Sequence, residues 1–403
     1  MGRRPSTTVT VATVTVPCVK IAVVAETAEA ESRVALVPDQ VPVLTGLGYD
    51  VAVEPQAGAA ADFADELYAE AGATVDSEAL QEAGLVLSVQ PLRTDQIRRL
   101  RQGAATMSFL PVSASLDQVA DLRDCGITSF ALELVPRISR AQSMDALSSQ
   151  ALVAGYRCAV VAAGLLRRFF PLNMTAAGTV RPAEVVVLGA GVAGLQAIAT
   201  SKRLGAVVRA YDVRAAAAEE IRSVGAQAIE LELETLEGAG GYAREMSEDR
   251  AARQLELLAP YIAAADALIT TAAVPGRTAP MLVTREMVEA MKPGSVVVDL
   301  AAESGGNVEG AEPGRVKAIG DVRLWGARNV PSQMPGPAST LLAQNIVNLV
   351  TLMTAEGTFA PDFEDEIVAG SCVTHDSTIR NQPAAALFAP PEQPADQTEG
   401  NHP

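Results

Sequence analysis

The sequence is poor in the residues that most often move protons or bind metals. It has two histidines, His375 and His402, and its four lysines are Lys20, Lys202, Lys292 and Lys317. The four cysteines are spread over the chain without a CxxC pair. This pattern is typical of a reducing compartment and predicts neither disulfides nor a metal site.

Positive charge is also scarce, because 31 Lys and Arg face 48 Asp and Glu for a net charge of −17. Such a surface repels phosphate backbones and anionic lipids, so we expect no nucleic-acid partner. The longest apolar runs, residues 159–166 and 341–353, are short or are interrupted by Gln344, Asn345 and Asn348. We therefore expect no membrane-spanning segment.

A length of 403 residues with 49% hydrophobic content is enough for two or three domains with proper cores. From Lys20 onward, short β-branched runs alternate with helix-length segments, which is typical of parallel sheets with crossover helices. We predict an α/β fold with two Rossmann-like parallel-sheet domains, joined by long helices, and a cofactor in the interdomain cleft.

The predicted boundaries follow the two βα series. A long helix over 148–170, ended by Pro171, should link the domains, and a helix over 339–353 should return to the first. The predicted parts are an N-terminal extension at 1–18, a first α/β domain at 19–147 plus 334–380, a Rossmann domain at 148–333, and a disordered tail at 383–403.

A glycine-rich turn follows the predicted strand EVVVL and opens a predicted helix; its residues are Gly189, Ala190, Gly191, Val192, Ala193 and Gly194. These spacings give a tight turn, close backbone approach to a pyrophosphate, and close packing of helix on strand. Amides at the helix start can bind the phosphates. Since such turns can also be purely structural, the flanking strand and helix carry the prediction of a dinucleotide site.

An acidic residue, Asp212, ends the next predicted strand, where a carboxylate can accept both hydroxyls of an adenosine ribose. A carboxylate about 4 Å from a 2′-phosphate costs about 4 kcal/mol per charge pair at an effective dielectric near 20. We therefore expect NAD(H) rather than NADP(H) in the 148–333 domain. Arg214 is the counter-argument, since it can pair with a 2′-phosphate, but we expect it to begin the next helix.

Oxidation of an alcohol or amine by NAD needs a group, usually His or Lys, that takes the accompanying proton. Neither residue occurs between Ile21 and Ser201. Hydride passage from one nicotinamide directly to another needs no such base, so the composition favours a dinucleotide-to-dinucleotide reaction. Carboxylates such as Glu133 or Asp145 keep other schemes open.

A polar segment, residues 137–148, precedes the linking helix and is a candidate ligand loop. Arg137 can reach a phosphate, Gln142 can pair with a nicotinamide carboxamide, and Asp145 can accept hydrogen bonds. Ser148 is the predicted N-cap of the helix. A polar interdomain loop with a helix cap is the plainer alternative.

A second candidate loop, residues 237–246, is rich in glycine. The glycines favour mobility, and Tyr242 can close over a ligand. A surface excursion without function is the alternative here.

Seven motifs together resemble one protein family. They are ETAEAESRVALVPDQV, PRISRAQSMDALSSQ, TAAGTV, GAGVAGLQAIATSKRLGAVVRAYDVR, GAGGYAREM, TTAAVPGRTAP and MKPGSVVVDLAAESGGN. On these motifs the chain resembles the NAD(H)-binding component, domain I, of the proton-translocating nicotinamide nucleotide transhydrogenases. The RISRAQSMD and GGYA loops distinguish this component from generic Rossmann proteins.

The resemblance implies a two-lobed, dimeric subunit that holds NAD(H) in its cleft and has no metal. It implies catalytic positions at Arg137, Gln142, Asp145, Ser148 and Tyr242. It implies cofactor-binding positions at Gly189, Ala190, Gly191, Val192, Gly194, Asp212, Val213, Arg214, Gly241 and Ala272.

The same resemblance implies partner subunits. Hydride would pass to NADP(H) held by a beta subunit, and a membrane-spanning subunit would couple the transfer to proton movement. The chain itself would be cytoplasmic, peripheral to the inner membrane through its partners, and active only with them.

Alanine dehydrogenase, which resembles the chain in the start and the glycine motif, is the nearest alternative. That relative uses Lys and His in its first lobe to handle pyruvate and the proton. The corresponding stretches here carry Gln90 and Pro111. A non-enzymatic NAD-binding module is the remaining alternative.

Overall fold

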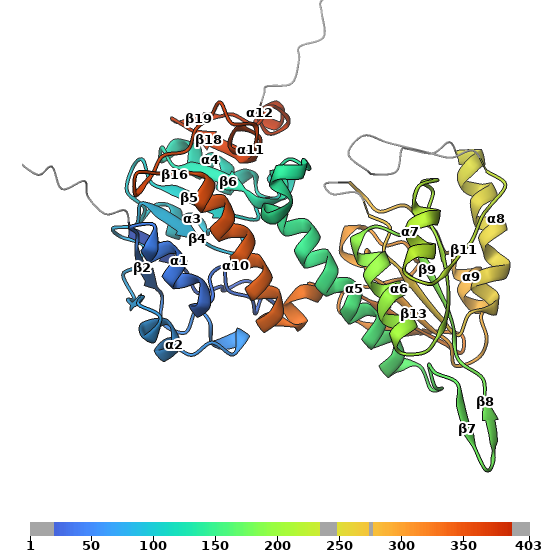
Figure 1. The fold of residues 1–403 in the computed structure, drawn as a ribbon. Coiled ribbons are helices and arrows are strands. Elements are labelled where there is room, and N and C mark those ends of the chain that lie inside the picture. Colours follow the sequence, from blue (N-terminus) through green and yellow to red (C-terminus); the bar gives the residue numbers. More distant parts are fainter. Residues whose placement is uncertain (1–19, 234–247, 274–276, 389–403) are drawn as a thin grey trace, which may run out of the picture.

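The computed structural model describes residues 20–233, 248–273 and 277–388. These residues form two lobes, each built round one mostly parallel β-sheet (Figure 1). Each sheet separates two apolar cores, one on each face. The chain is therefore a mixed, mainly parallel α/β protein of two lobes, and the predicted fold class is confirmed.

The first-lobe sheet has the strand order β19-β18-β6-β5-β4-β1-β2-β3. Strands β1 to β6 are parallel, and β18 and β19 add an antiparallel edge. The bounds are β1 (Lys20–Val23), β2 (Asp50–Val53), β3 (Thr74–Val75), β4 (Leu85–Leu87), β5 (Ala105–Ser108), β6 (Thr128–Ala131), β18 (Cys372–His375) and β19 (Thr378–Ile379). Its helices are α1 (Val41–Gly46), α2 (Asp65–Glu70), α3 (Thr94–Ile97), α4 (Leu116–Asp124), α10 (Pro335–Leu352), α11 (Glu366–Ser371) and α12 (Gln382–Phe388).

The second-lobe sheet has the order β11-β10-β9-β12-β13-β15-β14, and within it β14 runs antiparallel. The strands are β9 (Glu184–Leu188), β10 (Val207–Tyr211), β11 (Gln227–Ala228), β12 (Ala267–Thr270), β13 (Val296–Asp299), β14 (Val316–Ile319) and β15 (Val322–Gly326). The helices are α6 (Val192–Arg203), α7 (Ala217–Ser223), α8 (Glu248–Ala264) and α9 (Arg285–Glu289). Two short hairpins complete the described chain: β7 (Asn173–Thr175) with β8 (Gly178–Val180), and β16 (Thr354–Ala355) with β17 (Thr358–Phe359).

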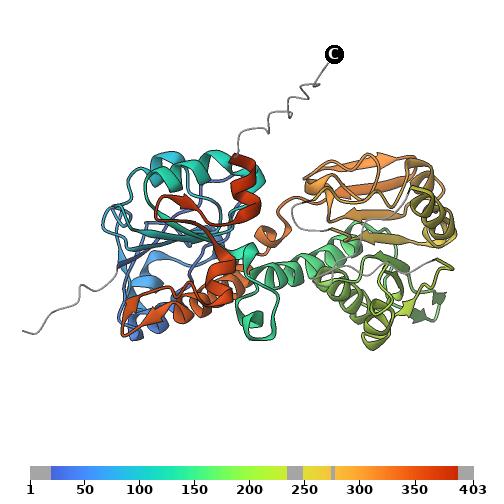
Figure 2. The ribbon, with the colours of Figure 1, turned by 90° about the horizontal axis from the view of Figure 1, so that it is seen from above.

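The 20-residue helix α5 (Ala146–Leu165) leaves the first lobe and lies along α6 of the second (Figure 2). The two helices touch closely at Gly155, where a Cβ atom would lie 2.0 Å from the carbonyl oxygen of Ala193. Only glycine fits at such a backbone contact. The start of α6 is therefore fixed against the middle of α5.

A buried ionic network anchors the chain where it returns to the first lobe. Arg33 pairs with Glu31, with 2.6 Å between Nη2 and Oε2, and the two side chains are 5% and 0% exposed. Arg33 also donates to Gln150 of α5 at 2.9 Å, and Ser332 of the returning segment donates to Glu31 at 2.9 Å. Both connections between the lobes thus meet at one cluster of hydrogen bonds.

The predicted end of the linking helix is wrong. The helix ends at Leu165, well before Pro171, and Leu166 is extended. Leu166 and Phe170 are buried in the second-lobe core, and Phe170 accepts a backbone hydrogen bond from Ala183. Burial of these two side chains, rather than the proline, ends the helix.

The predicted disordered tail at 383–403 is also wrong in its first part. Residues 382–388 form α12, in which Ala384 is buried and the ring of Phe388 lies 5.6 Å from the guanidinium of Arg123. The sequence-based prediction missed this because a short Ala- and Pro-rich helix has little hydrophobic periodicity. The N-terminal extension at 1–18 and residues 389–403 lie outside the described residues.

Among the described helices, one, α5, is long and apolar enough by length and composition to cross a membrane. Cys158, Ala159 and Ala162 of this helix are fully buried in the second-lobe core. Its apolar content is accounted for by packing against α6 and α10.

We expect Gly155→Ala to destabilise the protein by about 3 kcal/mol, because its methyl group collides with a backbone oxygen that cannot move freely. Gly164→Ala on the same helix is the matched control, since no heavy atom lies within 4 Å of a Cβ there. The control should be neutral or stabilising by about 0.5 kcal/mol. Urea unfolding measures both, and equal effects from the two changes would contradict the assigned contact.

Candidate functional site

The glycine turn joins β9 to α6 at the carboxyl edge of the second sheet. Gly189 has φ +96°, and a Cβ there would lie 2.7 Å from Thr271 Oγ1. A Cβ on Gly194 would lie 1.9 Å from the carbonyl oxygen of Gly189, so helix and turn are in direct contact. At Gly191, by contrast, no described atom lies within 4 Å of a Cβ. The turn is thus packed where it must be tight and open where a pyrophosphate would approach α6.

Asp212 follows β10 and lies beside this turn. Its carboxylate accepts from the backbone nitrogen of Ala190 at 2.8 Å and from that of Arg214 at 2.9 Å. The Arg214 guanidinium donates to both carboxylate oxygens, at 2.9 and 3.1 Å. The Asp212 side chain is 10% exposed, so its negative charge is held in one orientation at the edge of the turn.

The prediction that Arg214 begins the next helix is wrong. Helix α7 begins at Ala217, and Arg214 lies in the turn before it, paired with Asp212. The hydrogen bonds to Asp212 raise the pKa of Arg214, and the guanidinium charge is compensated at close range. A 2′-phosphate would have to break this pair, which strengthens the physical case for a nucleotide without that phosphate.

A buried network that was not predicted from the sequence orders the loops after β12 and β13. Asp299 is fully buried and accepts from Thr270 Oγ1 at 2.9 Å and from the backbone nitrogens of Ala301, Asn307 and Val308. Burial raises the pKa of Asp299, although these hydrogen bonds oppose the shift. Its position after a strand, like that of Asp212, was the signal available in the sequence.

Asn307 connects this network to the candidate site. Its side chain accepts from the backbone nitrogen of Ala272 at 3.0 Å and donates to the Ala272 carbonyl at 2.8 Å. Ala272 is itself close to the turn, because a Cβ on Gly189 would lie 3.0 Å from its backbone nitrogen. The structure therefore brings together the turn, Asp212 and Ala272.

The polar loop at 137–148 lies at the other end of α5, where the helix leaves the first lobe (Figure 1). Asp145 accepts from the backbone nitrogen of Ser148 at 2.9 Å and from its hydroxyl at 2.6 Å. The N-cap of α5 is thus Asp145, and the prediction of Ser148 as the cap is wrong by about one helical turn. Arg137 and Gln142 are exposed, while Asp145 and Ser148 are partly buried.

Helix α5 relates the two groups of predicted residues. Seven residues, about 10 Å of helix, separate Ser148 from the α6 contact at Gly155. A nucleotide whose pyrophosphate lies at the start of α6 can therefore direct its other end toward the loop. Tyr242 and Gly241 lie outside the described residues. Val192, the first residue of α6, is exposed, and Val213 is partly buried in the second-lobe core.

No lysine follows the carboxyl end of a parallel strand, and all four lysines are described. Lys20 begins β1, Lys202 lies in the last turn of α6, and Lys292 precedes β13. Lys317 pairs with Glu312 from the edge strand β14. Amines therefore stay away from the edge that holds the glycine turn.

The described histidine is equally distant from this edge. His375 ends β18, which is antiparallel to β6, and its Nδ1 lies 3.0 Å from the hydroxyl of Thr128 at the first residue of β6. The amino edge of the first sheet therefore carries the imidazole. Within the described ranges, no three His, Cys, Asp or Glu side chains are grouped to hold a metal ion.

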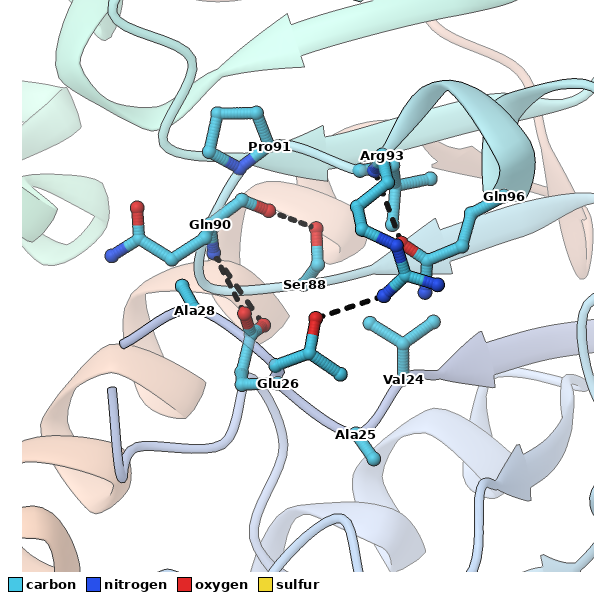
Figure 3. Close-up of a pocket in the computed structure, with 11 residues that line it drawn as sticks. Val24, Ala25, Glu26, Ala28, Ser88, Gln90, Pro91, Arg93 and Gln96 are labelled. Carbon is cyan, nitrogen blue, oxygen red and sulfur yellow. Dashed lines mark hydrogen bonds between the residues drawn. The ribbon is translucent and has the colours of Figure 1, made fainter. Parts of the chain in front are cut away.

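A cavity of about 160 Å³ lies in the first lobe, at the carboxyl ends of β1 and β4. There the carboxylate of Glu26 accepts from the backbone nitrogens of Val89 and Gln90 (Figure 3). The Gln90 side chain points away from Glu26 and donates to Glu31 at 2.7 Å. The described residues that line the cavity include neither Lys nor His.

Two neighbouring carboxyl groups here have opposite pKa shifts. Burial raises the pKa of Glu26 to about 7, since the hydrogen bonds from Val89 and Gln90 do not compensate for lost water. Burial also acts on Glu31, but the hydrogen bonds and charge of Arg33 lower its pKa to about 2. Direct pairing with a guanidinium thus keeps one buried carboxylate charged, whereas backbone hydrogen bonds alone do not keep the other charged at neutral pH.

The fold and the glycine turn define a two-lobed α/β protein of the dinucleotide-binding class. Family models agree along nearly the whole chain: the N-terminal domain of alanine dehydrogenase/PNT matches residues 22–154 and the C-terminal domain matches residues 158–382. The chain belongs to the alanine dehydrogenase/PNT family.

Relatives within this family differ in similarity. The chain is 46% identical over 373 residues to an NAD(P) transhydrogenase subunit alpha chain of Rhodospirillum rubrum, covering 89% of this chain and 97% of that one. It is 31% identical to alanine dehydrogenase of Mycolicibacterium smegmatis, over 88% and 93% of the two chains. A transhydrogenase structure from Sinorhizobium meliloti superposes with a TM-score of 0.82 at 43% identity, over 89% of this chain and 99% of that one.

We expect Glu26→Gln to stabilise the protein increasingly as the pH rises from 5 to 8. Because the folded-state pKa of Glu26 is raised, its favourable contribution is full below about 4.5 and is lost as the pH rises through about 7. The gap in unfolding free energy between variant and wild type should grow by up to about 3 kcal/mol over this range. Urea unfolding at three pH values measures it, with exposed Glu70→Gln as the control. Parallel profiles for Glu26→Gln and wild type would refute the assigned shift.

Proposed function

We propose that this chain is the NAD(H)-binding subunit of a proton-translocating NAD(P) transhydrogenase. Its reaction is the direct passage of hydride between NADH and NADP+ held by a partner subunit. The observation that carries the proposal is 46% identity to a transhydrogenase subunit alpha chain over 97% of that protein's length. The placement of every lysine away from the glycine turn supports the same reaction.

The adenosine half of NAD(H) fits the second lobe. The open face of Gly191 and the first amides of α6 would receive the pyrophosphate, and Asp212 would accept the ribose hydroxyls. Ala190, Gly189, Gly194 and Ala272 would form the wall of this pocket, with Val192, Val213 and Arg214 at its rim.

The nicotinamide half would lie toward the 137–148 loop. When bound, the nicotinamide supplies the hydride from its C4 atom. Arg137, Gln142, Asp145 and Ser148 would orient the ring, and the loop with Gly241 and Tyr242 would cover it. Since Arg137 and Gln142 are exposed, this end of the site stays accessible to a second protein. Alignment of two rings needs positioning and no proton carrier.

The partners and the location follow from the same proposal. A beta subunit would hold NADP(H), and a membrane-spanning subunit would couple hydride transfer to proton movement. The chain would then be cytoplasmic and peripheral to the inner membrane. Its relatives are named as alpha subunits, which supports the expectation of further subunits.

A homodimer is also included in the proposal. The β7-β8 hairpin projects from the second lobe (Figure 1), and apolar side chains are exposed on and beside it. Met174 is 76% exposed, Phe169 57% and Leu172 53%. An exposed apolar patch of this kind is typical of a protein interface, and a second copy of the chain would cover it.

An alanine dehydrogenase activity is disfavoured. The chain is less similar to alanine dehydrogenase than to transhydrogenase subunits. The Gln90 carboxamide is bound to Glu31, and Pro111 offers no ionisable group. A binding module without turnover remains as an outcome of the experiment.

The decisive experiment mixes the purified chain with an NADP-binding transhydrogenase subunit and follows reduction of an acetylpyridine nucleotide analogue. We expect turnover only when both proteins are present. Alanine with NAD+, and pyruvate with ammonia and NADH, should give none, because the described carboxyl edges of the sheets offer no amine or imidazole. Turnover of pyruvate without a partner would favour the dehydrogenase, and nucleotide binding with neither activity would favour the binding module.

We expect Asp212→Ala to weaken NADH binding about tenfold or more, because the ribose hydroxyls lose their charged acceptor. The same change releases the Arg214 guanidinium from its pairing with Asp212, so binding of NADPH relative to NADH should rise. Asp212→Ala combined with Arg214→Ala should lose that rise and is the matched control. Calorimetric titration with both nucleotides measures the ratio, and an unchanged ratio in the single variant would contradict the role of the pair.

A further inference from the structure

Helix α10 carries three polar residues that interrupt an apolar sequence and that the proposed function does not use. They are Gln344, Asn345 and Asn348. Asn345 is only 7% exposed and lies between residues of the first-lobe core, such as Leu342 and Ile346. An apolar side chain would be the ordinary choice at this position.

The two asparagines donate to one acceptor. Nδ2 of Asn345 lies 2.8 Å from the carbonyl oxygen of Ser143, and Nδ2 of Asn348 lies 2.9 Å from the same atom. Residues three apart lie on one face of a helix, so both amides reach the same point. A carbonyl oxygen has two lone pairs and can accept both hydrogen bonds.

Stability alone does not account for Asn345. Its Oδ1 is buried without a hydrogen-bond partner in the described part of the chain. A buried unpaired amide oxygen destabilises a fold and calls for an explanation. Turning the amide over would set Oδ1 against the Ser143 carbonyl, so the observed orientation is the one that forms a bond. The explanation therefore lies in what the amide holds.

Ser143 lies inside the 137–148 loop, directly after Gln142. Ala141 and Met144 are buried in the first-lobe core, and Arg140 donates to both carboxylate oxygens of Asp365 at 2.8 and 2.9 Å. The Ser143 carbonyl belongs to the planar peptide that leads to Met144. Holding that carbonyl fixes the peptide next to the exposed Gln142.

We propose that Asn345 and Asn348 are positioning residues for hydride transfer, which together hold the Ser143 carbonyl and thereby set Gln142 and Asp145 at the nicotinamide end. The inference rests on the proposed function for the hydride step. The asparagines act through the loop and contact no ligand. Without them the loop samples more orientations, and fewer bound rings are aligned for transfer. Binding of the adenosine half, which lies on the other lobe, is preserved.

The first test compares Asn345→Leu, Asn348→Leu and the double variant in the full chain, mixed with the NADP-binding subunit. Each single variant keeps one hydrogen bond to Ser143, so its hydride-transfer rate should fall about threefold or less. The double variant leaves the carbonyl without these donors and should lose about tenfold or more, beyond the product of the single effects. The dissociation constant for NADH should change less than about threefold in all of them. Thr351→Val is the control, because that hydroxyl bonds within α10.

The second test reads the loop itself. Trypsin cleavage after Arg137 and Arg140, mapped by mass spectrometry, should be at least about fivefold faster in the double variant. The midpoint of thermal unfolding should stay equal or rise in Asn345→Leu, since the unpaired Oδ1 is removed. Should the leucine double variant fail to fold, the corresponding serine double variant, which is smaller and polar, is measured in the same way.

The results that would overturn the inference are specific. Wild-type transfer rate and wild-type cleavage in the double variant would show that the asparagines do not set the loop. Loss of rate, NADH binding and thermal stability in equal proportion would show a structural role only. An inactive wild-type mixture would overturn the proposed function, whereas an active wild type with an equally active double variant would overturn this inference alone.

Discussion

The contact between α5 and α6 is the constraint on which the rest of the structure depends. At Gly155 the backbones approach so closely that a methyl group would overlap the carbonyl of Ala193. This contact fixes the start of α6, and with it the glycine turn, against a helix that begins in the first lobe with the 137–148 loop. The candidate site is therefore a property of two helices in contact rather than of either sheet.

Acidic residues at strand and helix ends do most of the local ordering. Asp212 holds Ala190 and Arg214, Asp299 holds Thr270 and the loop that contains Asn307, and Asp145 caps α5. Each carboxylate collects backbone or side-chain donors that would otherwise need water. The protein thus uses its excess of acids to build the carboxyl edge, while its few lysines lie elsewhere.

The chemistry that this arrangement supports is restrained. Two rings that exchange hydride directly need alignment and exclusion of competing groups, and a site whose described residues include no amine or imidazole provides no such route for a substrate proton. Glu26 is consistent with this, because burial raises its pKa to about 7 and its hydrogen bonds come from backbone nitrogens. A charged pair, Glu31 with Arg33, serves instead to join the connections between the lobes.

The sequence by itself determined the fold class, the glycine turn and the strand-end acid, because hydrophobic period and glycine spacing are local properties of the chain. It also predicted the loop before α5, although not that Asp145 rather than Ser148 caps the helix. Only the tertiary structure decided that the linking helix ends at Leu165, that Arg214 is bound to Asp212, and that Asn345 and Asn348 meet the Ser143 carbonyl. These outcomes depend on contacts between residues as far apart as 143 and 345, and no local pattern in a single sequence encodes which distant partner a side chain will meet.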